Sequence, residues 1–158
     1  KAARFRAGPP SSFGGTDMSL VRDLLAKPER LTPASKYTVL NGVGYLVGGM
    51  LILLWPSVTQ ALFRDPAFAG QEEGLMRIIG FTVVLIGWFY VFGGRSGSRQ
   101  VVAASIIDRL LFVPAVLVPI ALAGVFPHLL LSFVLLDVSL AVGAWALLRR
   151  EWSSSTGR

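Results

Sequence analysis

The chain has 158 residues, of which 53% are hydrophobic and 15% are charged, and its net charge is +6 at pH 7. A soluble domain of this size could not cover so much apolar surface with so few charged side chains. Because the chain has no cysteine and one histidine, disulfides, thiolate metal sites and histidine-rich metal centres are excluded. The hydrophobic residues fall in four long runs, which is typical of a protein that crosses a membrane several times.

The first 36 residues form a region of their own ahead of the first apolar run. Residues 1–15 combine basic and small residues without any acid, which is typical of an irregular arm. Residues 18–27 place apolar side chains on one helical face, which predicts a short amphipathic helix. This helix packs on the membrane surface, on a partner or on the bundle itself. We expect a partner protein to hold the arm. Since the chain begins at Lys1, we also expect a mature product that has lost a targeting segment, or a partial chain.

The four hydrophobic runs predict four transmembrane helices, because each is near the length of about 20 residues that crosses the hydrocarbon. Thr32 is the predicted N-cap of the first helix, with Pro33 at its first position. The longest connection, residues 56–73, has room for a short interfacial helix. The predicted spans are residues 37–55, 75–92, 101–123 and 128–148. The sequence therefore predicts an all-α integral membrane four-helix bundle at residues 37–149, after the N-terminal extension and before a basic tail at 150–158.

Basic residues gather on one side of the predicted bundle. The N-terminal region, the second loop and the tail carry most of the lysines and arginines. The first loop carries Arg64 together with Asp65, Glu72 and Glu73, and the third loop has no charge. The positive-inside rule therefore predicts that both termini lie on the cytoplasmic-equivalent side, which is stroma or matrix in an organelle.

Small residues in three of the predicted helices favour close helix packing, because helices in lipid associate through close contact and hydrogen bonds. One helix has a GxxxG pair, another has glycines at heptad spacing, and the last has serine and glycine four residues apart. We expect these faces to close the bundle, with some faces left for partners. The predicted packing residues are Gly44, Gly48, Gly80, Gly87, Ser139 and Gly143.

Two opposite charges, Asp108 and Arg109, lie inside the third predicted span, which also contains two helix-kinking prolines. At about 1.5 Å per residue, Arg109 and Asp137 of the fourth span reach nearly the same depth. We therefore expect an ion pair between Arg109 and Asp137, and a hydrogen bond from Tyr90 to Asp108, since an unpaired charge in the membrane is costly. This cluster is either a staple that fixes helix register or a proton relay or substrate site, and we favour the staple.

Other candidate sites are few. His128 follows a turn at a helix end, where it is a candidate axial ligand of a chlorophyll magnesium or a haem; the alternative is a solvated surface histidine. Arg77 is expected to pair with Glu73 four residues before it. We predict no catalytic set and no metal site, because no serine–histidine–acid arrangement or cluster of metal ligands stands out.

Three stretches resemble small uncharacterised bacterial four-helix membrane proteins of the DoxX-like type. They are LMRIIGFTVVLIGWFYVFGGR, IIDRLL and LLDVSLAVGAWALL, and the resemblance extends over residues 37–149. It implies the four-helix fold and assigns no reaction. The residues that carry it are Arg77, Gly80, Gly87, Tyr90, Arg109 and Asp137.

Two functions from different classes fit these observations. The first is a non-catalytic accessory subunit of a large energy-transducing membrane complex, with a photosystem–antenna supercomplex in the thylakoid favoured over a respiratory complex in the mitochondrial inner membrane. Its partners are other membrane subunits and lipids, and chlorophyll and carotenoid are its candidate cofactors. The second is a small membrane enzyme or transporter that uses Asp108, Arg109 and Asp137. A polar cavity inside the bundle would favour the second function.

Overall fold

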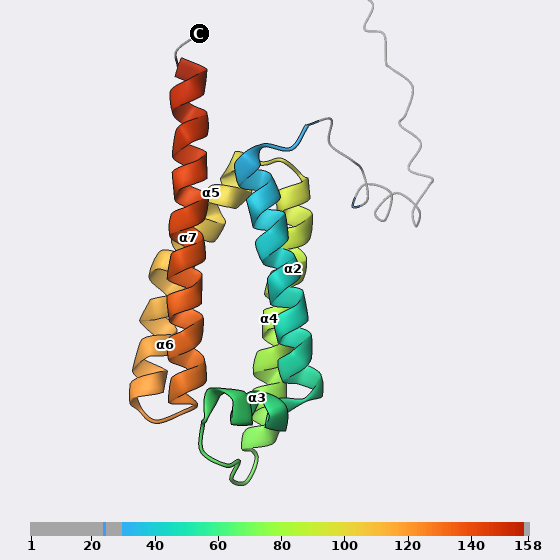
Figure 1. Ribbon diagram of the computed structural model, residues 1–158, viewed down its shortest axis with the longest axis vertical. Coiled ribbons are helices and arrows are strands. Elements are labelled where there is room, and N and C mark those ends of the chain that lie inside the picture. Colours follow the sequence, from blue (N-terminus) through green and yellow to red (C-terminus); the bar gives the residue numbers. More distant parts are fainter. Residues whose placement is uncertain (1–23, 25–29, 157–158) are drawn as a thin grey trace, which may run out of the picture.

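The computed structural model describes residues 24 and 30–156, with side chains through residue 153. The predicted arm and all of the predicted amphipathic helix except Leu24 lie outside this part of the chain, as do the last two residues of the tail. Apart from turns and short irregular loops, the described part is helical (Figure 1). Its helices are α2 (Pro33–Leu54), α3 (Pro56–Phe63), α4 (Glu72–Arg95), α5 (Arg99–Ile107), η1 (Asp108–Phe112), α6 (Val113–Leu122) and α7 (Pro127–Thr156).

Four helical spans are long and apolar enough to cross a membrane, which confirms the predicted all-α membrane bundle. They are α2, α4, the continuous run Arg99–Leu122 formed by α5, η1 and α6, and the first 27 residues of α7. Helix α2 begins at Pro33, as predicted, with Thr32 as its cap: the Thr32 hydroxyl oxygen accepts a hydrogen bond from the Ser35 N–H at 3.2 Å. Helix α3 occupies the connection in which a short helix was expected.

The backbones of α2 and α4 come into direct contact along a line of glycines. A Cβ atom on Gly42 would lie 2.8 Å from the Gly87 carbonyl oxygen, and one on Gly49 would lie 2.8 Å from that of Gly80. Any larger residue at these positions would push the two helices apart. The predicted packing role of Gly80 and Gly87 is therefore confirmed, and their partners are two glycines seven residues apart on α2.

Two of the predicted packing glycines have no such role. A Cβ atom on Gly44 or Gly48 would meet nothing within 4 Å, because their face of α2 is turned away from α4 toward an open groove beside α7. Ser139 is exposed, and its hydroxyl donates to a carbonyl of its own helix at 2.7 Å. Gly143 does pack, since a Cβ atom there would lie 3.0 Å from Cζ of Tyr37 on α2.

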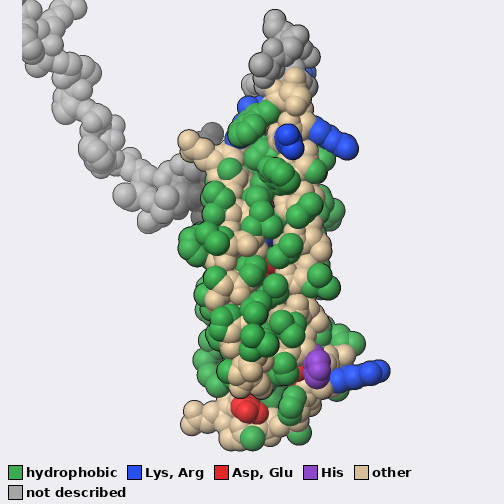
Figure 2. Space-filling view, turned by 90° about the vertical axis from the view of Figure 1, so that its left-hand side faces the viewer, with side chains coloured by type: hydrophobic (Ala, Val, Ile, Leu, Met, Phe, Trp, Pro, Cys, Tyr) green, Lys and Arg blue, Asp and Glu red, His purple; other side chains and the backbone are tan. Residues whose placement is uncertain are grey.

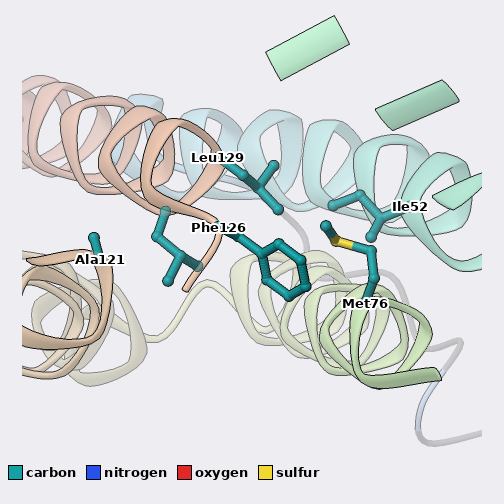
Figure 3. Close-up of a cluster of buried hydrophobic side chains, with 6 residues drawn as sticks. Ile52, Met76, Ala121, Phe126 and Leu129 are labelled. Atoms are coloured by element: carbon teal, nitrogen blue, oxygen red, sulfur yellow. The ribbon is translucent and has the colours of Figure 1, made fainter. Parts of the chain in front are cut away.

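Helix α6 packs on α7, so the molecule consists of two helix pairs, α2–α4 and α6–α7, with α5 passing between them at one end (Figure 1). At the opposite end of the bundle, an apolar cluster next to α3 joins the two pairs. Figure 3 shows Ile52 and Met76 directed toward Phe126 and Leu129. The buried members of this cluster are Ile52, Met76, Ala121, Phe126, Leu129 and Leu130.

Carboxylates tie both ends of α7 to other parts of the fold. The buried Asp65 carboxylate accepts hydrogen bonds from the N–H groups of His128 and Leu129, at 3.0 and 3.2 Å, and so caps the start of α7. Near the end of α7, Glu151 accepts a hydrogen bond from the Ala34 N–H at 2.8 Å. Both carboxylates satisfy backbone donors at a helix N-terminus, where a negative charge is favourable.

Candidate intramembrane binding site

The two charges of the third span lie in a π-helical turn, η1. Pro114 has no N–H to donate to the carbonyl four residues before it, so the regular helical ladder is interrupted there. Val113 instead donates to the Asp108 carbonyl five residues back. This wider turn changes the faces on which Asp108 and Arg109 point, relative to an uninterrupted helix.

Arg109 is 1% exposed and lies against two tyrosine rings. Its Cζ atom is 4.2 Å from the ring centroid of Tyr90 and 5.2 Å from that of Tyr45. The rings meet edge to face, with their centroids 5.5 Å apart. Cation–π attraction of this kind is strongest where water is excluded, so the two tyrosines hold the guanidinium in place. Sequence reasoning missed Tyr45, although a tyrosine in the middle of an apolar span is a visible signal.

Asp108 accepts a hydrogen bond from the Tyr90 hydroxyl at 3.0 Å, as expected from their similar depth. Tyr90 therefore contacts both charges of the turn: its hydroxyl binds Asp108 and its ring faces Arg109. The turn, the tyrosine and the two charges form one local unit built from α4 and η1.

The predicted ion pair between Arg109 and Asp137 is not formed. Neither residue forms an ion pair with another described residue, unlike Arg77 with Glu73 and His128 with Asp65. The guanidinium is turned onto the tyrosine rings instead, and its Nε and Nη2 atoms have no hydrogen-bond partner within the described part of the chain. Asp137 is 4% exposed, and its Oδ1 atom likewise has no partner there.

Asp108 and Asp137 line the same cavity, which has a volume of about 410 Å³ and lies between α4 and α6 against α7. Its other polar lining residues are Tyr45 and Thr82, and the rest of its wall is apolar. Figure 2 shows a small acidic patch within the hydrophobic middle of one face of the molecule. Two carboxylates against one guanidinium leave this region with an excess negative charge when all three groups are ionised. The site therefore favours a proton or a cationic group.

The other predicted sites are arranged separately. Nδ1 of His128 lies 3.2 Å from Oδ1 of Asp65, and the imidazole is 62% exposed, so a role as a pigment ligand stays a prediction. Arg77 forms the expected pair with Glu73 at 2.9 Å and also donates to the Leu53 carbonyl at 2.9 Å. Within the described residues, no group of three or more His, Cys, Asp and Glu side chains could hold a metal ion.

Comparisons with protein-family models, with curated proteins and with solved structures give no match to this chain. The resemblance to DoxX-like proteins therefore stays a prediction. The case for a function rests on the geometry of the cavity between α4 and α6.

Proposed function

We propose that this chain is an integral membrane protein that binds an amphiphilic cation in the cavity between α4 and α6. The observation that carries the proposal is the Asp137 carboxylate, which is buried, lines this cavity and has an oxygen without a hydrogen-bond partner in the described structure. Buried polar atoms in proteins almost always have a partner, so one without a partner beside a cavity points to a ligand. The proposal corresponds to the membrane enzyme or transporter that the sequence left open.

The chemistry of the cavity limits the ligand. Its mostly apolar wall suits a hydrophobic body, and the carboxylates suit a positive group at one end. Tyr90 already holds Asp108, and Arg109 balances one of the two negative charges. Asp137 is therefore the carboxylate left to pair with the ligand, since a buried charge is stable only with a partner.

Two ions of the same shape and opposite charge test this proposal. Radiolabelled tetraphenylphosphonium and tetraphenylborate are equilibrated with the protein in lipid nanodiscs, and empty nanodiscs give the partitioning into lipid. We expect saturable binding of the phosphonium at least about tenfold tighter than that of the borate, because only the phosphonium can pair with Asp137. Equal binding of the two ions, or no binding above that to empty nanodiscs, would contradict the proposal.

Variants assign the binding to the cavity. Asp137→Asn removes the charge with little change of shape, and we expect it to weaken phosphonium binding at least about tenfold, or about 1.4 kcal/mol. The control is Glu73→Gln, which removes an exposed carboxylate outside the cavity. If Asp137→Asn binds the phosphonium as well as the unmodified protein does, the carboxylate is not the binding group.

We also propose that both termini of the chain, and the loop between α4 and α5, face the cytoplasmic-equivalent side. Basic residues flank the spans at the end of the bundle where the termini lie. They are Arg30, Lys36, Arg95, Arg99, Arg149 and Arg150. The absence of native cysteine makes the test direct. Ser57→Cys, on exposed α3, should react with a membrane-impermeant maleimide in intact cells or organelles, and Ser98→Cys, between α4 and α5, only after permeabilisation. The opposite pattern would reverse the orientation.

The accessory-subunit hypothesis rests mainly on the N-terminal extension, most of which lies outside the described residues. It stays a prediction, with chlorophyll and carotenoid as candidate cofactors and the thylakoid as the favoured location. Purifying the native protein under mild conditions, and recording the absorption spectrum and the subunits that accompany it, would test it. Co-purification with a pigmented complex would support it, and isolation as a colourless single chain would oppose it.

A further inference from the structure

We propose that the groove between α5 and α7 binds one anionic phospholipid, with an acyl chain along the groove and the phosphate at Arg149. This groove has a volume of about 420 Å³, and it shares no lining residue with the cavity between α4 and α6. The inference is therefore independent of the function proposed above. The lining residues are Ala103, Ile106, Ile107, Leu110, Trp145, Leu148, Arg149 and Trp152.

The length of the groove matches one leaflet of a bilayer. Its deepest lining residue on the third span is Leu110, eleven residues after the start of α5 at Arg99. At about 1.5 Å per residue this is about 16 Å, close to half of a hydrocarbon core about 30 Å thick. The deeper wall is made of isoleucine and leucine side chains, which suit an acyl chain.

Arg149 lies at the depth of the lipid headgroups. It follows the start of α7 at Pro127 by 22 residues, or about 33 Å, which is about the full thickness of the hydrocarbon core. Its Cζ atom is 5.7 Å from the ring centroid of Trp145, and Trp152 lines the groove one turn further on. Tryptophan rings are typical of this interface, and a guanidinium is well suited to pair with a phosphate.

The surrounding charges leave Arg149 available to an anion. Arg150, Arg99 and Arg95 lie at the same end, and Figure 2 shows basic side chains gathered there. The acid nearest in sequence is Glu151, but it accepts a hydrogen bond from the Ala34 N–H of α2. Residues two apart in a helix point about 200° away from each other, so Glu151 is directed away from the groove side of α7. Arg149 forms no ion pair with another described residue.

Lipid retention in native mass spectrometry tests the site. The protein is exchanged from nanodiscs containing equal amounts of phosphatidylglycerol and phosphatidylcholine with the same acyl chains. We expect one phosphatidylglycerol to stay bound at activation energies that remove phosphatidylcholine. Arg149→Gln should reduce this retention at least tenfold. Arg64→Gln, which removes an exposed arginine on the opposite loop, should leave it unchanged.

Two further arms distinguish a lipid from a free phosphate. Leu110→Trp fills the deep part of the groove and keeps Arg149, so it should also reduce retention of phosphatidylglycerol. Glycerol 3-phosphate, which has the phosphate without acyl chains, should not bind at lipid-equivalent concentrations. Equal retention of the two lipids, an unchanged Arg149→Gln variant or equal losses in the Arg149 and Arg64 variants would overturn the proposal. Binding of glycerol 3-phosphate that Leu110→Trp does not change would also overturn it, because it would identify a simple phosphate site.

Discussion

Replacing Gly87 with alanine tests whether direct backbone contact holds α2 against α4. The new Cβ atom would lie 2.6 Å from the Leu46 nitrogen and 2.8 Å from the Gly42 carbonyl oxygen. Ordinary contacts of a Cβ atom begin at 3.4 Å, so the two helices would have to separate by about 0.8 Å at this point (3.4 minus 2.6). The contacting atoms belong mainly to backbone, which cannot move aside as the end of a flexible side chain can.

The expected loss of stability follows from this separation. Overpacking of a close contact costs about 1–3 kcal/mol. A gap of 0.5–1 Å along the rest of the interface also removes about a quarter to a half of the attractive energy of each dispersion contact. Alanine also favours the helix over glycine by about 1 kcal/mol. Gly74 on the same helix provides the control, because a Cβ atom there meets nothing within 4 Å. We therefore expect Gly87→Ala to be about 1–3 kcal/mol less stable than Gly74→Ala.

Unfolding by SDS in mixed micelles, followed by circular dichroism, measures the difference between the two variants. The comparison offsets part of the change in helix propensity, because both alanines replace a glycine of α4, although Gly74 lies in its first turn and Gly87 in its interior. Equal unfolding midpoints for Gly87→Ala and Gly74→Ala would refute direct backbone contact as the force that holds α2 to α4. A stabilised Gly87→Ala variant would refute it more strongly.

Two further substitutions test the polar contacts, each by the same SDS unfolding assay. Tyr90→Phe removes the hydrogen bond to Asp108 and keeps the ring against Arg109, so we expect a loss of about 1.5–3 kcal/mol; an unchanged midpoint would mean that this hydrogen bond does not stabilise the fold. Asp65→Ala removes the cap of α7 and should cost about 1–2 kcal/mol, whereas Asp65→Asn should keep most of the stability, because an amide oxygen can still accept from the backbone. Equal losses for the two Asp65 variants would show that charge, and not capping, is what matters.

The spans and their first cap could be predicted because both depend on local chemistry. A run of about 20 apolar residues has few alternatives to crossing the hydrocarbon as a helix. Thr32 followed by Pro33 has the residue types of a helix start, and the structure shows this cap. The observed helices extend past the predicted spans at most ends, because their terminal turns carry polar residues that counting apolar residues leaves out.

The glycine contacts were predicted correctly on α4 but not on α2. The prediction chose Gly44 and Gly48, whereas Gly42 and Gly49 make the contacts. The better signal was the seven-residue spacing. It is shared by Gly42 and Gly49 on α2 and by Gly80 and Gly87 on α4, as a seam between two antiparallel helices requires. A GxxxG pair on one helix specifies a smooth face but not the partner that covers it.

Four residues of the charged cluster were predicted, but Tyr45 and the partner of Arg109 were not. The similar depth of Tyr90 and Asp108 in the membrane was enough to predict the hydrogen bond between them. It could not show that Arg109 would turn onto two aromatic rings and leave Asp137 facing a cavity, because that choice depends on Tyr45 from another helix and on the local winding of the third span. Contacts that several elements create together are not encoded in the spacing of any one segment.

The π-helical winding of η1 affects how a helical wheel of the third span must be drawn. A helical wheel with 100° per residue, drawn from Arg99 through to Leu122, sorts residues correctly on either side of the wide turn but not across it. Two wheels, one for each half, are needed to say which side chains face lipid and which face the protein.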